Sequence, residues 1–141
     1  MKNLANCTPS EFIAQTARMK DAVVDLNDKV KFSELRAQKP KYKNIKDSMT
    51  AEQKKAIIEE NAQLLKNQAI KNTFDILDKM LVEYPQETLA VLALSCFVEP
   101  SDVDSYTMDD YFGNIMDMIE SKNVMRFFTF LVSMTKPQSD T

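Results

Sequence analysis

Five carboxylates lie close together after the segment SCFV at positions 95–98, and their chemistry would suit a calcium site. They are Glu99, Asp102, Asp104, Asp109 and Asp110. An EF-hand loop that began at Asp102 would need an oxygen ligand at its fifth position, glycine at its sixth and glutamate at its twelfth. The chain has Tyr106, Thr107 and Gly113 at those positions. We therefore predict that these acids cap helices and solvate a turn, and that the chain has no metal-binding residues.

Catalytic side chains are scarce. The absence of histidine removes the commonest general base and the commonest metal ligand. A single glycine excludes the GxSxG, Walker A and GxGxxG motifs. Cys7 and Cys96 have no CxxC spacing, and neither has a histidine that could activate it. We predict two reduced, buried thiols, no catalytic or cofactor-binding residues, no cofactor, and no enzyme activity.

The same scarcity of glycine indicates the fold class. Tight β-hairpin turns depend on glycine, which averages roughly 7% of residues in proteins, whereas Gly113 is the only one in 141 residues. Hydrophobic content of 44% and charged content of 28% are typical of a globular chain. We predict an all-α fold, a compact helical bundle of about five to six helices with one long central helix.

Two helix starts have clear local signals. Thr8 precedes a proline, which suits the first helical position, and Glu11 completes a capping box. Thr50 and Gln53 form a second capping box, from which an apolar pattern runs to about residue 84. Such a helix would be roughly 50 Å long if unbroken. A weak point at Asn27-Asp28 predicts a break ahead of a second short helix that Pro40 ends.

The C-terminal half contains the most apolar segments. QETLAVLALSCF, residues 86–97, is apolar nearly all round, which predicts a helix buried at the centre of the bundle. Helices are also expected at 108–121, where Thr107 is the cap, and at about 123–134. These two are rich in Met and Phe, which indicates either core filling or an adaptable surface that binds a helix of another protein. The candidate partner-binding residues are Tyr111, Met118, Phe127, Phe128 and Leu131.

We expect one helical domain over residues 1–141. It comprises an N-terminal helical segment (8–36), a basic linker (37–49), the long helix plus a C-terminal helical core (50–134), and a flexible tail (135–141). No apolar run approaches the ~20 residues that a membrane span needs. The start MKNLANCTPSEF lacks the apolar core of a signal peptide. These features predict a cytoplasmic protein that does not interact with membranes.

Charge is distributed unevenly along the chain. Residues 1–72 contain 14 Lys/Arg and 9 Asp/Glu, whereas residues 73–141 contain 4 and 12. The segment Lys29–Lys46 has seven positive residues and one negative residue, a density that could contact phosphates. It could equally be a solvated linker, or face the acidic half of a neighbouring subunit. If the segment contacts phosphates, the alternative function is a regulatory helical protein that binds nucleic acid.

Two segments resemble a known family. NCTPSEFIAQTARM, residues 6–19, and YPQETLAVLALSCFVEPSDVDSYTMDDYFGNIM, residues 84–116, are similar to the small tail assembly chaperones of long-tailed phages and prophages of Gram-positive bacteria. The resemblance covers most of the chain and is clearest in Asn6–Met19 and Tyr84–Phe130. It is weaker in the linker and in the first half of the long helix, residues 51–68.

The resemblance implies an all-helical, non-enzymatic protein that binds the tape measure protein and keeps it soluble while tail tube subunits polymerise around it. It also implies a homo-oligomer in the cytoplasm of the bacterial host that is absent from the mature virion. Members of the family are often made in a longer form by ribosomal frameshifting, and an extension here would begin around SMTKPQSDT. A structural tail or head-completion component is a further alternative.

Overall fold

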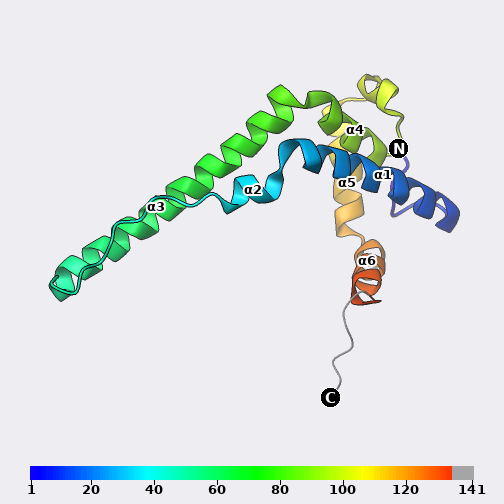
Figure 1. Ribbon diagram of the computed structural model, residues 1–141. Coiled ribbons are helices and arrows are strands. Elements are labelled where there is room, and N and C mark those ends of the chain that lie inside the picture. The colour runs from blue at the N-terminus through cyan, green and yellow to red at the C-terminus, as the bar shows by residue number, and fades with distance from the viewer. Residues whose placement is uncertain (135–141) are drawn as a thin grey trace, which may run out of the picture. The chain divides into compact units, whose positions relative to one another are not determined.

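Helices make up the regular structure of the protein. A computed structural model describes residues 1–134, and these contain helices but no strand (Figure 1). The all-α prediction is therefore confirmed, with one long helix, and the predicted tail 135–141 lies outside the described residues. The elements are α1 (Pro9–Val30), α2 (Phe32–Ala37), α3 (Ala51–Asp78), the π-helix η1 (Lys79–Glu83), α4 (Pro85–Ser95), the 3-10 helix η2 (Pro100–Ser105), α5 (Met108–Glu120) and α6 (Lys122–Met134).

The chain divides into two compact units. The terminal unit joins Met1–Asp25 to the segment that begins at Gln86, and the middle unit is Leu26–Pro85. The terminal unit therefore contains most of α1 together with α4, α5 and α6, whereas α2 and α3 belong to the middle unit. The prediction of a single helical domain stays a prediction.

Capping boxes fix three helix starts. The Oγ1 atoms of Thr8, Thr50 and Thr107 accept the backbone N–H of the residue three positions later, at 3.2, 3.1 and 3.3 Å. The side chain of that later residue accepts the threonine N–H in return, at 3.1, 3.0 and 3.0 Å. Each box satisfies two backbone donors that a helix start leaves unpaired. The helix starts predicted from these threonines are confirmed.

The predicted break and the second short helix, α2, are both present, but the break lies at Lys31 and not at Asn27-Asp28. The backbone N–H of Lys31 still donates to Asn27 O at 2.7 Å, and Lys31 itself has a left-handed backbone, with φ of 59°. Asn and Asp weaken a helix by only about 0.7 kcal/mol each. Leu26 and Val30 are buried on either side of them, and this burial outweighs the weak local preference.

The linker of the middle unit is residues 38–50, one residue later than predicted at each end, and it follows α3 closely (Figure 1). Asn61 of α3 binds both backbone polar groups of Lys43, accepting its N–H at 2.9 Å and donating to its carbonyl at 3.0 Å. Three turns further along α3, Asn72 donates to Gln38 O at 3.1 Å. The linker therefore covers the face of α3 that carries Asn61 and Asn72.

α4 supplies the core of the terminal unit, as its apolar sequence predicts. Ala93 and Cys96 are almost completely buried and cluster with Val98, Val103 and Tyr111. Leu89, Leu92 and Ile115 pack against this cluster. The prediction of a buried thiol is confirmed for Cys96, and Cys7 is half-buried; both are free cysteines.

A Schellman-type turn ends α4 at Phe97, which has a left-handed backbone with φ of 58°. Val98 N–H donates to Ala93 O at 3.0 Å, and Phe97 N–H donates to Leu94 O at 3.3 Å. Beyond the turn, Arg18 forms two 2.8 Å hydrogen bonds with the Glu99 carboxylate. The segment that raised the question of a calcium site is thus the joint between α4 and η2.

The left-handed backbone at position 97 gives a stability prediction. Phe97→Gly should be about 1 kcal/mol more stable than Phe97→Ala, because only glycine adopts this conformation without strain. Both variants lose the phenyl ring and its contact with the Lys2 ammonium, 5.8 Å from the ring centre, so that loss cancels in the comparison. Urea unfolding followed by circular dichroism measures the difference.

The matched control is Ala62→Gly at an exposed position inside α3. There glycine should cost roughly 0.5–1 kcal/mol relative to alanine, which is the opposite sign. Equal or greater stability of Phe97→Ala would contradict the assignment of the strained turn.

Candidate functional site

α5 and α6 form the candidate site, and a single non-helical residue joins them. Ser121 has an extended backbone, with φ of −71° and ψ of 110°, and its N–H donates to Met118 O at 3.2 Å. Both helices belong to the terminal unit. The site is therefore positioned by whatever fixes these helices to the core and to the N-terminal residues.

The buried face of α5 is fixed by hydrogen bonds. Tyr111 is 1% exposed, and its hydroxyl donates to Val103 O at 2.6 Å. Burial raises the pKa of the Tyr111 phenol. One turn later, Asn114 accepts from the Asn3 side chain at 2.6 Å and donates to Lys2 O at 2.9 Å. These bonds attach the N-terminal residues to α5.

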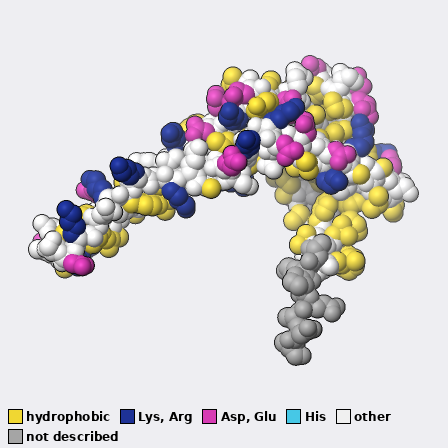
Figure 2. Space-filling view, in the orientation of Figure 1, with side chains coloured by type: hydrophobic (Ala, Val, Ile, Leu, Met, Phe, Trp, Pro, Cys, Tyr) yellow, Lys and Arg dark blue, Asp and Glu magenta, His cyan; other side chains and the backbone are white. Residues whose placement is uncertain are grey.

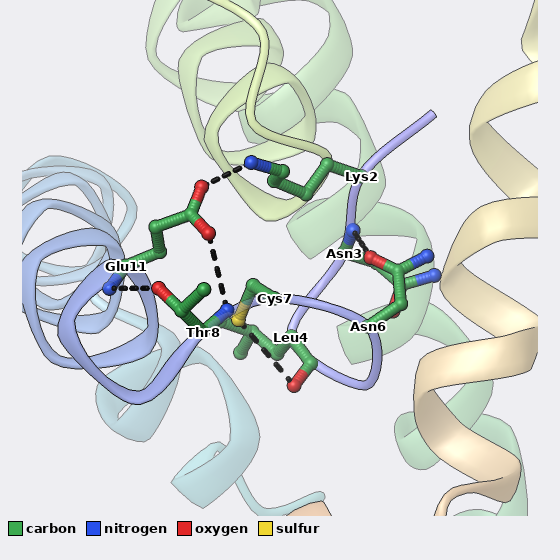
Figure 3. Close-up of polar contacts among 7 residues, drawn as sticks. All are labelled: Lys2, Asn3, Leu4, Asn6, Cys7, Thr8 and Glu11. Atoms are coloured by element: carbon green, nitrogen blue, oxygen red, sulfur yellow. Dashed lines mark hydrogen bonds and ion pairs between the residues drawn. The ribbon is translucent and has the colours of Figure 1, made fainter.

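The N-terminal residues form an ordered loop (Figure 3). Asn3 N–H donates to Asn6 Oδ1 at 2.8 Å, and the Lys2 ammonium pairs with the Glu11 carboxylate. The same carboxylate accepts the Thr8 N–H in the capping box of α1. The pKa of Glu11 is therefore held at about 2, mainly by the hydrogen bond from Lys2 and then by those from Thr8.

An apolar cavity of about 280 Å³ lies between this loop, the start of α1 and the start of α6. Beside this cavity, aromatic rings of α1 and α6 pack against each other. The ring of Phe12 lies 5.1 Å from that of Phe127 at 89°, and 5.8 Å from that of Phe128, within the range of favourable aromatic pairs. The residues lining the cavity include Leu4, Cys7, Pro9, Phe12, Ile13, Val124 and Phe127.

The outer faces of α5 and α6 expose many large apolar side chains. We define the C-terminal apolar surface as those that are 41–67% exposed. Figure 2 shows hydrophobic side chains gathered over α6. The members of the surface are Met108, Phe112, Met116 and Ile119 of α5, and Met125, Phe130, Leu131, Val132 and Met134 of α6.

α6 has little to bury these side chains against within the described residues. Val124 is the only buried residue of α6. Met125 and Phe130 line a shallow depression of about 500 Å³ along the helix, together with Lys122 and Arg126. An apolar helix face that stays exposed typically marks a site of protein–protein contact. The site can therefore bind an apolar segment, with two cations at its edge.

The predicted partner-binding residues are distributed between core and surface. Leu131 is exposed, Met118, Phe127 and Phe128 are half-buried, and Tyr111 is buried. Because its ring belongs to the core, Tyr111 is left out of the surface proposed below. Exposed residues that the prediction omitted include Phe112, Met116, Ile119, Met125, Phe130 and Val132.

A helical pattern could have located part of this set. Met108, Phe112, Met116 and Ile119 follow steps of four, four and three, which define one face of a helix. Tyr111 and Ile115, which contact the core, lie beside this face, about 60° and 20° around the helix from Met108. Because buried and exposed apolar residues are neighbours around α5, composition does not distinguish them.

The basic segment Lys29–Lys46 is a second candidate site, in the middle unit. Residues 26–85 contain twelve Lys/Arg and nine Asp/Glu. Lys39, Lys41 and Lys46 are exposed, but the Lys43 ammonium lies 2.5 Å from the Glu60 carboxylate. This pairing reduces the charge that the segment presents to a phosphate backbone.

Comparisons with known proteins add no assignment. No family model, curated protein or solved structure matches the chain. In residues 1–134 no group of three or more His, Cys, Asp or Glu side chains is placed to hold a metal ion. None of the described helices is both long enough and apolar enough to cross a membrane. The function is therefore inferred from the geometry of the surface and from the sequence resemblance.

The Lys2–Glu11 pair gives a prediction about acid stability. Because the folded pKa of Glu11, about 2, lies below the usual value of 4.5, its stabilising contribution is complete above about pH 4.5 and is lost as the pH falls towards 2. Glu11→Gln, which retains a capping-box residue, should lose stability less steeply than the wild type over this interval. Urea midpoints measured at several pH values test the difference.

Glu59→Gln is the matched control, because Glu59 is exposed and makes no ion pair within the described residues. It should reproduce the slope of the wild type. Parallel slopes for the wild type and Glu11→Gln would show that the pair does not stabilise the N-terminal loop.

Proposed function

We propose that the protein is a non-enzymatic phage tail assembly chaperone that binds and solubilises the tape measure protein during tail morphogenesis. The observation that carries this proposal is the C-terminal apolar surface, nine large side chains exposed on α5 and α6. The sequence resemblance supports it independently. In this role the protein acts in the cytoplasm of the bacterial host and does not remain in the mature virion.

The side chains of the surface suit a long, helical, aggregation-prone client. Methionine is unbranched and polarizable, so Met116, Met125 and Met134 can repack around different apolar partners. Phe112 and Phe130 provide larger rigid contacts. Such a surface could bind the apolar face of a client helix, as in a helix-in-groove contact. It would not require one particular client sequence.

The terminal unit provides a fixed support for this surface. The buried faces of both helices are fixed by the Tyr111 and Asn114 hydrogen bonds and by the Phe12 aromatic cluster. The exposed faces can then exchange client segments while the fold stays intact. The proposed homo-oligomer and the proposed contact with the tail tube protein belong to the same role. So does a frameshifted longer product, whose extension would begin around SMTKPQSDT.

Co-expression with the tape measure protein tests the proposal. Phe130→Asp should move the client to the insoluble fraction, because Phe130 is 59% exposed and its loss leaves the core intact. Loss of one fully buried apolar contact costs about 1.5–3 kcal/mol of binding free energy, which is about tenfold to a hundredfold in affinity. Circular dichroism of the purified variant verifies that it is folded.

Ile58→Asp on α3 is the matched control, because Ile58 is 57% exposed and lies in the middle unit. It should keep the client soluble. If a folded Phe130→Asp variant solubilises the client as well as the wild type, the C-terminal apolar surface is not the client site.

The exposed lysines of the linker favour one alternative, a regulatory protein that binds nucleic acid. This function would appear as salt-sensitive binding that is lost when Lys39, Lys41 and Lys46 are neutralised. A structural tail or head-completion component would instead be present in purified virions. Neither result is expected for a chaperone.

A further inference from the structure

A second exposed apolar strip runs along the C-terminal half of α3 into η1. Ile70, Phe74, Leu77 and Leu81 are separated by steps of four, three and four residues, which place them on one face of a helix. They are 48%, 65%, 42% and 62% exposed. We refer to these four residues as the α3 seam.

The linker leaves most of the α3 seam uncovered, and only Leu77 lines a depression beside Gln38 and Lys39. The linker binds the face of α3 that carries Asn61 and Asn72. At 100° per residue, Phe74 lies about 160° around the helix from Asn72. The middle unit thus covers one face of α3 and exposes the opposite, apolar face.

The order of the seam residues is self-complementary. Steps of four, three and four correspond to alternating d and a positions of a coiled-coil heptad. When two copies lie antiparallel, Ile70 meets Leu81 of the second copy, and Phe74 meets Leu77. Each layer then combines an a with a d residue, and the contact obeys two-fold symmetry.

The charges beside the seam distinguish the two directions of pairing. Lys71 and Asp78 both follow a d position, are exposed, and form no ion pair within the described chain. An antiparallel pair places Lys71 of each copy beside Asp78 of the other. A parallel pair would place Lys71 beside Lys66 of the second copy, which is repulsive. Charge complementarity therefore favours the antiparallel arrangement.

We propose that two copies of this chain associate antiparallel through the α3 seam, with Lys71 and Asp78 pairing across it. The seam lies in the middle unit and the C-terminal apolar surface lies in the terminal unit. The inference deepens the homo-oligomer of the proposed function by giving its contact, and because the seam and the client site lie in different units, each can fail without the other.

Sedimentation velocity of the full chain tests the contact. The wild type should sediment at twice the chain mass of 16.2 kDa, and Phe74→Glu should sediment at the mass of one chain. Ile58→Glu, a charge on the same helix but off the seam, should remain dimeric. A monomeric wild type, or a dimeric Phe74→Glu variant, would overturn the proposal. A Phe74→Glu variant that is monomeric and unfolded would also overturn the proposal. It would mean that Phe74 packs within its own chain and not against a second copy.

A charge exchange tests the direction of pairing. Lys71→Asp alone or Asp78→Lys alone places like charges together twice in the dimer and should weaken the association about tenfold. The double variant Lys71→Asp/Asp78→Lys should restore the affinity of the wild type. Failure of the double variant to recover would contradict the antiparallel arrangement, even if Phe74→Glu dissociates the dimer.

Discussion

The hydrogen bond between the Asn3 and Asn114 side chains is the contact on which the arrangement of the terminal unit depends. Both residues are more than nine-tenths buried, and a buried amide without a partner costs about 1–3 kcal/mol. The N-terminal loop and α5 therefore require each other. The loop in turn provides Lys2 for Glu11 at the start of α1, and α1 positions Phe12 against α6.

This framework leaves many large apolar side chains exposed. Ala93, Cys96 and Tyr111 fill a small core, while α5 and α6 expose nine large apolar side chains and the α3 seam exposes four more. The proposed dimer contact and the proposed client site therefore use different side chains, in different units of the chain.

Local signals in the sequence predicted the fold best. The capping boxes at Thr8 and Thr50 and the cap at Thr107 were predictable because donor and acceptor lie three residues apart. The apolar run of α4 likewise predicts its own burial. The break at Lys31 could not be predicted, because it depends on the burial of Leu26 and Val30, a tertiary effect.

The candidate site was predictable only in outline. Composition indicated that the last two helices are rich in Met and Phe, but it did not separate Tyr111 from Phe112. Which residues of α5 face the core is set by tertiary contacts. Asn3 hydrogen-bonds Asn114, and Val103 accepts the hydroxyl of Tyr111. The path of the linker depends in the same way on Asn61 and Asn72, whose partners lie 18 and 34 residues away.

Hydrogen–deuterium exchange with and without the tape measure protein tests whether the C-terminal apolar surface binds this client. Client binding through the C-terminal apolar surface predicts slower exchange of backbone amides in α5 and α6. The exchange of the linker, residues 38–50, should be unchanged. Protection confined to the linker, or no protection of α6 while the client stays soluble, would show that the client does not bind the C-terminal apolar surface.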